Sequence, residues 1–291
     1  MRFFTLIFLI VMTDASFAEA VDMRLDAASD GVVSISNIAG SVKVNGWSRN
    51  EVEVTGTLGK NVEELIFERN SNEIEITVRV SKRHGYSISS DLVINVPEKS
   101  TIEVVGVSAD IEIQNVHGPQ DLQSVSGDIE SEIYAADVEI TTVSGDVEVQ
   151  GDDVPGHAEL SSVSGDVEAQ NLAGALVADS VTGDVVVVNS SFDRVRVETV
   201  NGDIIFDSGL SDHGSFSLET INGDVDVKFT DSISARFDIE TFNGDIRNCF
   251  GPEPVRTSKY APGTELKFTE GDGEGRVTIK TLNGDLRLCK D

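Results

Sequence analysis

The stretch S-V-T-G-D-V at residues 180–185, followed by T-V-N-G-D-I at 199–204 and T-I-N-G-D-V at 220–225, decides the fold. The same signature recurs along the chain as S-V-S-G-D-I at 124–129, T-V-S-G-D-V at 142–147, S-V-S-G-D-V at 162–167, T-F-N-G-D-I at 241–246 and T-L-N-G-D-L at 281–286. Successive glycines are 18 to 21 residues apart, except for a final interval of 40. A weaker copy at 107–111 carries Ala109 in place of glycine. A repeat of this length indicates a stack of similar units.

Apolar residues alternate with polar ones on both sides of each turn, which predicts two strands per repeat. The fold class is therefore all-β, a single-stranded β-solenoid (β-helix) with coils of about 20 residues, in which stacked repeats share one core. We expect three apolar columns in that core, five residues before, two residues before and two residues after each glycine. The column two residues before the glycine contains Val125, Val143, Val163, Val181, Val200, Ile221, Phe242 and Leu282.

The turn residues are the candidate site residues. A sharp corner favours glycine because glycine adopts positive φ without a Cβ penalty, and the following aspartate is expected to cap its own turn by accepting backbone N–H groups. The turn pairs are Gly127 and Asp128, Gly145 and Asp146, Gly165 and Asp166, Gly183 and Asp184, Gly202 and Asp203, Gly223 and Asp224, Gly244 and Asp245, and Gly284 and Asp285. Stacked Asn201, Asn222, Asn243 and Asn283 are expected to form an amide ladder.

No metal site is predicted. The minority alternative is Ca²⁺ on the aspartate column, since Ca²⁺ binds carboxylate and carbonyl oxygens. However, the nine-residue calcium-binding repeat is absent. No cofactor is expected.

The ends of the chain differ from the regular repeats. Residues 1–20 read as a cleaved secretory signal peptide, with Arg2, an apolar run and a small-residue site at 18–20. Residues 21–105 are expected to form a β-rich cap or irregular solenoid, in which only 61–65 suggests a helical turn. Residues 106–291 form the regular solenoid. The interval 245–283 contains either a long loop or one extra coil.

Cys249 and Cys289 each lie five residues after a turn glycine and so occupy one column. In an exported protein we expect a disulfide if their coils are adjacent. An intervening coil would separate them too far for a bond.

The formal net charge of -29 excludes nucleic acid as a partner, because phosphate binding requires Lys and Arg. No second apolar stretch suggests an integral membrane segment after signal cleavage. Three residues after the glycines, a column changes from Glu130, Glu148 and Glu168, through Val186, Ile205 and Asp226, to Arg247 and Arg287. We interpret it as a solvated face, with a polarised binding face as the alternative.

The S-V-S-G-D and T-x-N-G-D motifs, the segment at 40–59 and V-P-E-K-S at 96–100 resemble the DUF4097 family of β-strand repeat proteins. The resemblance covers nearly the whole mature chain and implies an exported or envelope-associated β-solenoid. The family's adhesin label is itself an inference, and the resemblance supplies no catalytic residues.

These observations predict a non-enzymatic exported envelope protein, an adhesin-like module that binds polysaccharide or protein partners, in the periplasm, secreted or at the cell surface. No catalytic residues are predicted, since G-x-S-x-G and P-loop motifs are missing. The alternatives are a β-helix enzyme acting on envelope glycans and a structural or stress-sensing spacer. Ligand identity, oligomeric state and solenoid handedness stay open.

Overall fold

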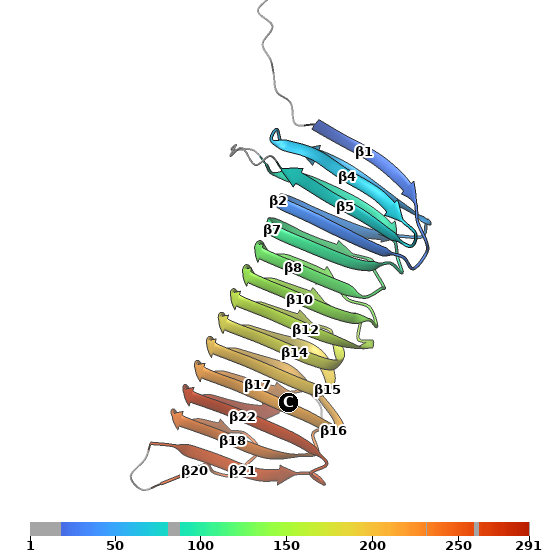
Figure 1. Cartoon of the computed structure of the whole chain (residues 1–291). Coiled ribbons are helices and arrows are strands. Elements are labelled where there is room, and N and C mark those ends of the chain that lie inside the picture. The colour runs from blue at the N-terminus through green and yellow to red at the C-terminus, as the bar shows by residue number, and fades with distance from the viewer. Residues whose placement is uncertain (1–18, 81–87, 231, 259–261, 291) are drawn as a thin grey trace, which may run out of the picture.

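The computed structural model shows a slender stack of β-coils with the N-terminus at one end (Figure 1). It describes residues 19–80, 88–230, 232–258 and 262–290. All regular secondary structure in these ranges is strand, so the predicted all-β solenoid is confirmed. No helix that could cross a membrane occurs among the described residues.

The N-terminal strands are β1 (Glu19–Asp26), β2 (Val32–Trp47), β3 (Glu51–Leu58), β4 (Val62–Asn70), β5 (Glu73–Val80), β6 (Ser90–Pro97) and β7 (Thr101–Gln114). The regular coils contain β8 (Gln120–Ser126), β9 (Ile129–Glu132), β10 (Asp137–Ser144), β11 (Val147–Gln150), β12 (Pro155–Ser164), β13 (Val167–Gln170), β14 (Ala173–Thr182), β15 (Val185–Asn201), β16 (Ile204–Asn222) and β17 (Val225–Phe229). The C-terminal strands are β18 (Ala235–Asn243), β19 (Ile246–Asn248), β20 (Val255–Arg256), β21 (Thr264–Glu270), β22 (Gly275–Asn283) and β23 (Leu286–Lys290).

Each regular coil crosses two walls joined by the glycine turn. Wall A contains β8, β10, β12, β14, β22, β18 and the C-terminal parts of β15 and β16, which pair in parallel with equivalent residues opposite each other. Wall B contains β9, β11, β13, β17, β23, β19 and the N-terminal parts of β15 and β16, also in parallel. Side chains that point between the walls form one continuous core. Near the C-terminal end this core is aromatic, with ring centroids 4.4–6.3 Å apart along Phe192, Phe206, Phe216, Phe229, Phe237, Phe250 and Phe268.

The turn glycines are required for a different reason from the one predicted. Of the eight, only Gly183 has a positive φ, +156°. Instead, a Cβ on each would lie 1.9–2.2 Å from the carbonyl oxygen of the corresponding residue in the neighbouring coil, closer than any real contact. The spacing between hydrogen-bonded coils, about 4.8 Å, therefore excludes a side chain on that side of the turn. At the corresponding position of β7, Ala109 is buried, lies opposite Gly40 of β2, and turns its carbonyl toward Gly127.

The aspartates also act differently from the prediction. The Oδ1 of Asp110 and of every turn aspartate except Asp245 accepts the backbone N–H of the aspartate in the next coil, at 2.7–3.2 Å, rather than an N–H of its own turn. These bonds join the coils along the edge of the stack. The amide ladder is present beside them, because Asn222 donates to Asn201, Asn283 to Asn222 and Asn243 to Asn283.

The coils at the C-terminal end do not stack in the order in which they follow one another along the chain. β22 pairs with both β16 and β18, and β23 pairs with both β17 and β19. The last coil of the chain is thus inserted between two earlier ones, as the order β17, β22, β18 in Figure 1 shows. Neither of the two alternatives for residues 245–283, a long loop or an extra coil, describes this segment. It contains β21, which pairs antiparallel with β18 and with β20.

The N-terminal end is closed by antiparallel pairs, β1 with β3, β3 with β6 and β4 with β5. Residues 62–65 belong to β4, so the suggested helical turn is wrong; pairing with β5 prevails over local propensity. The expected boundary at 105–106 falls inside β7, and the core continues across it. Of the expected signal peptide, residues 1–18 lie outside the described residues, and Glu19 and Ala20 begin β1.

Candidate binding groove on wall A

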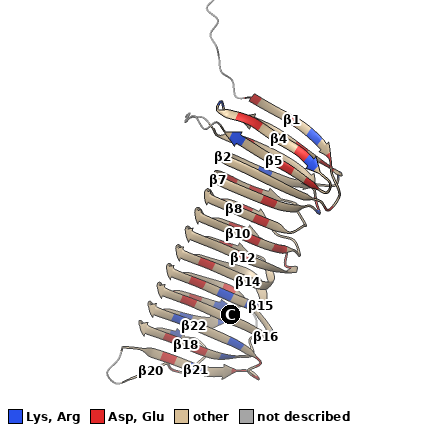
Figure 2. Ribbon diagram, viewed as in Figure 1, with Lys and Arg blue, Asp and Glu red and all other residues tan. Residues whose placement is uncertain are grey.

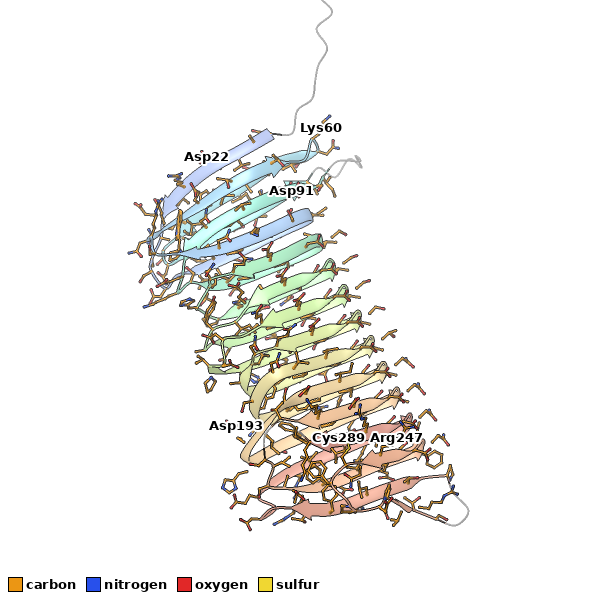
Figure 3. The ribbon with its side chains drawn as sticks, turned by 180° about the vertical axis from the view of Figure 1, so that it is seen from behind. Asp22, Lys60, Asp91, Asp193, Arg247 and Cys289 are labelled. Atoms are coloured by element: carbon orange, nitrogen blue, oxygen red, sulfur yellow. A yellow bond between two sulfur atoms is a disulfide. The ribbon has the colours of Figure 1, made fainter. Side chains whose placement is uncertain are left out.

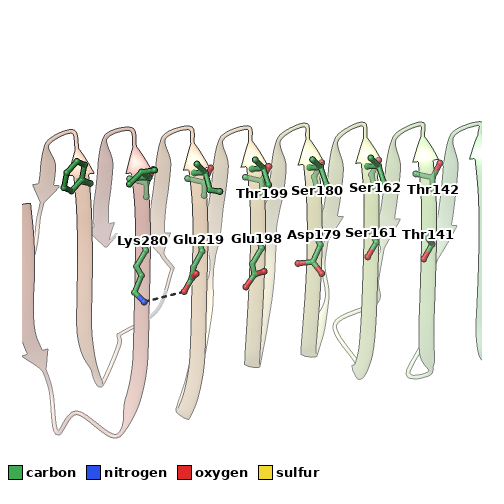
Figure 4. A pocket seen from close by; sticks show the side chains of 18 of the residues that line it. Thr141, Thr142, Ser161, Ser162, Asp179, Ser180, Glu198, Thr199, Glu219 and Lys280 are labelled. Carbon is green, nitrogen blue, oxygen red and sulfur yellow. Dashed lines mark ion pairs between the residues drawn. The ribbon is translucent and has the colours of Figure 1, made fainter. Parts of the chain in front are cut away.

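A shallow groove of about 750 Å³ runs along the outer surface of wall A, from β10 to β18. Three parallel rows of side chains line it, each supplied by one position of the repeat (Figure 4). We call them the hydroxyl row, the apolar row and the acidic row, at three, two and four residues before the turn glycine. The stack of coils therefore places chemically similar groups at regular intervals along the molecule.

The hydroxyl row points into the core. It comprises Ser124, Thr142, Ser162, Ser180, Thr199, Thr220, Thr281 and Thr241, of which Thr142, Ser162, Ser180, Thr199, Thr220 and Thr281 line the groove. These side chains are all at least 95% buried. Six of them donate to the carbonyl of a turn glycine in the adjacent coil at 3.0–3.1 Å. The buried hydroxyl thus has a hydrogen-bond partner, and the bond links one coil to the next.

The apolar row points outward, because it follows the inward hydroxyl along an extended strand. In spatial order it contains Val107, Val125, Val143, Val163, Val181, Val200, Ile221, Leu282 and Phe242. Val200 is half-buried, and the others are 44–49% exposed. The prediction that this column lies in the core is therefore wrong.

The acidic row lies two residues further from the turn. Within the groove, in spatial order, it consists of Thr141, Ser161, Asp179, Glu198, Glu219, Lys280 and Glu240. Glu198 pairs with Arg196 at 2.8 Å, and Glu219 with Lys280 at 3.8 Å (Figure 4). Figure 2 shows further acidic residues on wall A toward the N-terminal end, where Glu159, Glu139 and Asp121 lie six residues before the turn glycine.

Asp179 is the most constrained carboxylate of the acidic row. It is half-buried, and its Oδ1 is enclosed with no hydrogen-bond partner among the described residues. Burial, followed by repulsion from Glu198, raises the pKa of Asp179, although Arg196 partly opposes this. A further cation that enters the groove would stabilise the ionised form of this carboxylate.

Wall B carries the column that changes sign. The structure places Arg287 between Asp226 and Arg247, and Arg287 contacts Asp226 at 3.1 Å. Partial desolvation, followed by repulsion from Glu168 and Glu130, raises the pKa of Glu148. Arg247 and Cys289 mark the C-terminal end of this wall in Figure 3.

Cys249 and Cys289 form a disulfide with Cα atoms 4.8 Å apart, between the ends of β19 and β23. They are neighbours because the last coil is inserted next to β19. Among the described residues, no group of three or more His, Cys, Asp or Glu side chains is arranged to hold a metal ion. The aspartate column uses its Oδ1 atoms for the bonds between coils.

Sequence reasoning missed the groove because it assigned the apolar row to the core. A signal was available in the alternation itself. Leu122 and Ser124 are two residues apart and share the inward face, which leaves Val125 on the outside. The repeated Ser or Thr before each valine marked the buried position.

A family model described as Toastrack DUF4097 matches residues 33–288. Two solved structures are similar. A "putative adhesin" from Bacteroides fragilis NCTC 9343 is 12% identical, covering 93% of this chain and 97% of that chain, with a TM-score of 0.48. A "putative lipid binding protein" from Parabacteroides distasonis ATCC 8503 is 12% identical, covering 92% and 96%, with a TM-score of 0.44. No curated protein matches.

Proposed function

The chain belongs to the Toastrack DUF4097 family, and from this premise we propose that it is a non-enzymatic, exported binding module of the cell envelope. Its ligand is an envelope polysaccharide or protein that lies along wall A. The observation that carries the proposal is the apolar row, which exposes an aliphatic or aromatic side chain in coil after coil. Export is inferred from the signal-like sequence at 1–20.

The apolar row is a regular feature of the repeat. In the eight coils with a turn glycine, the residues directly before and after this position are Ser, Thr or Asn, while the position itself is Val, Ile, Leu or Phe. Thr would suit an exposed strand position equally well, since β-branched residues all favour strands. A contiguous exposed apolar surface rimmed by polar groups is typical of an interaction site.

The rigidity of the stack also favours binding. Parallel pairing holds neighbouring coils in register along wall A. A surface that is ordered before binding loses little conformational entropy on binding, which increases affinity. The rows therefore act as a preformed linear surface.

The arrangement of carboxylates supports binding rather than glycan cleavage. Glycosidases place two carboxyl groups on opposite sides of the scissile bond. The carboxylates of the acidic row all project from the same wall, one per coil. A substrate on this surface would meet them from one side only.

The test uses two isoleucines with equal exposure on opposite walls. Ile221 in the groove and Ile205 on wall B are both 44% exposed and both belong to β16. The exported chain is incubated with purified cell-wall polysaccharide and, separately, with immobilised envelope proteins, and the bound fraction is measured. We expect one preparation to bind, Ile221→Thr to weaken binding several-fold, Ile205→Thr to leave it unchanged, and the polysaccharide to remain intact.

Equal binding by the wild type and Ile221→Thr would show that the groove is not the binding surface. Release of shortened glycans, abolished by changing one carboxylate, would establish the enzyme alternative instead. Circular dichroism and thermal unfolding of both variants verify that they are folded.

A further inference from the structure

We propose that the groove on wall A binds an amphipathic α-helix of a partner protein, with an aliphatic stripe flanked on one side by Lys and Arg. This inference rests on the proposed function and specifies the chemistry of its ligand. The helix axis lies along the stack, so that its aliphatic stripe covers the apolar row and its basic flank lies over the acidic row.

The spacing of the coils favours a helix over an extended chain. Neighbouring coils are about 4.8 Å apart, and one helical turn rises about 5.4 Å. An extended peptide repeats the same side-chain face only every 6.4–6.8 Å or so. A helix therefore presents a side chain near almost every coil, whereas a strand loses register at each step.

The separation of the two rows matches the width of a helix face. The acidic and apolar rows are two residues apart on each strand, roughly 6–7 Å. A helix with its side chains is about 10–12 Å in diameter, so a row at this distance to one side of the apolar row lies beneath the flank of the same helix. A stripe and its adjacent flank on one helix can thus contact both rows at once.

The charges of the groove require a basic partner. Asp179, Glu198, Glu219 and Glu240 line it, with Lys280 as the one lysine or arginine among its lining residues. Asp179 is half-buried, and its enclosed Oδ1 has no hydrogen-bond partner among the described residues. The positive charge of an incoming Lys or Arg would stabilise this carboxylate from the groove side. Complementary charge also excludes anionic polymers, because like charges across an interface are repulsive.

The aliphatic character of the apolar row argues against a neutral polysaccharide. Sugar rings carry hydroxyl groups, and burying these against Val, Ile and Leu side chains leaves them without hydrogen-bond partners. Helix-in-groove recognition instead uses an apolar helix face laid on an apolar surface. From Val163 to Phe242 the row spans six coils, or roughly 24 Å, which corresponds to a helix of about 16 residues.

The experiment uses synthetic, fluorescently labelled 16-residue peptides and the full exported chain. The first peptide has Leu at i, i+3, i+4 and i+7 with Lys along one flank, the second replaces Lys by Glu, and the third scrambles the first. Binding is followed by fluorescence anisotropy at low and physiological salt. We expect the Leu/Lys helix to bind at least tenfold more tightly than either control peptide.

Variants of the protein locate the contact. Ile221→Thr should weaken binding of the Leu/Lys peptide several-fold, while Ile205→Thr should not change it. Asp179→Asn combined with Glu240→Gln should reduce the salt dependence of binding. Equal binding of the scrambled peptide, or equal loss in Ile205→Thr, would overturn the inference.

The two proposals fail in different ways. If Ile221→Thr reduces envelope binding but the Leu/Lys peptide does not bind, the helix is the wrong ligand and the groove remains the binding surface. If Ile221→Thr leaves envelope binding unchanged, the proposed function fails whatever the peptides do.

Discussion

At the scale of single residues, the hydroxyl three positions before each turn glycine decides which side chain the turn buries. Thr220 donates to the Gly202 carbonyl at 3.1 Å and is 5% exposed. With the hydroxyl inside, the next residue, Ile221, must point outward. A small polar contact in the core therefore creates the exposed apolar row.

We predict different effects of the same substitution at two positions of the hydroxyl row. Thr220→Val removes the donor to a turn carbonyl and should lower the free energy of unfolding by about 1–2 kcal/mol. Thr142, which is fully buried, has no hydrogen-bond partner among the described residues. Thr142→Val should thus leave stability unchanged or slightly increase it, because an unpaired buried hydroxyl is unfavourable.

Urea unfolding at equilibrium measures both variants. Similar losses at both positions would mean that the row acts through packing and not through its hydrogen bonds.

At the scale of strands, stacking places like charges next to each other. Glu148 in β11 lies between Glu130 in β9 and Glu168 in β13. Partial desolvation and the charges of Glu168 and Glu130 raise the pKa of Glu148. The folded state therefore holds the Glu148 proton more tightly than the unfolded state does, and ionisation of this carboxyl opposes folding.

We predict that Glu148→Gln raises the melting temperature at pH 7, because it removes a carboxylate whose ionisation opposes folding. The gain should shrink as the pH falls through the raised pKa and disappear below the pKa of the unfolded state. It should also shrink at high salt, which screens exposed charges. Differential scanning calorimetry between pH 3 and 7 measures this, with Glu63→Gln in the edge strand β4 as the control.

A gain that is independent of pH would contradict the electrostatic explanation. The same gain in Glu63→Gln would indicate a general effect of the lower net charge.

At the scale of the whole molecule, the C-terminal coil, formed by β22 and β23, lies between two coils that precede it in the chain. β22 lies between β16 and β18, and β23 lies between β17 and β19, where the disulfide joins the two coils. Among the strands that the structure describes, the coil formed by β18 and β19 thus pairs in parallel with the C-terminal coil alone. Its attachment depends on residues that follow it in the chain.

We predict that removal of residues 275–291, which form the C-terminal coil, detaches β18 and β21 from the rest of the stack. Hydrogen exchange followed by mass spectrometry should show loss of protection in β18 and β21, while β8 to β14 remain protected. The full chain with Cys249→Ser and Cys289→Ser is the control, since it lacks the disulfide but retains the coil. Retained protection of β18 would mean that it can pair directly with β16.

Several features of the fold could be predicted from the sequence because they depend on local pattern. The turn signature located each regular coil along the chain, and alternation on both sides of the turn predicted two strands per repeat. The inward columns that contain Leu122 and Ile129 are buried as expected. The ladder of Asn201, Asn222 and Asn283 followed from equivalent positions in stacked coils.

The sequence by itself thus determined the turns, the coil length and the two-walled stack, since each is written in a pattern that recurs in every repeat. Only the tertiary structure decided the order of the last coils and the side on which the apolar row lies. Coils with the same T-x-N-G-D signature have the same edges, so any of them can pair with any other. Which one becomes the neighbour depends on the connecting segments and on the cap formed by β20 and β21. Likewise, Val125 is apolar whether it points inward or outward, and only the hydrogen bonds between neighbouring coils place the hydroxyl of Ser or Thr inside.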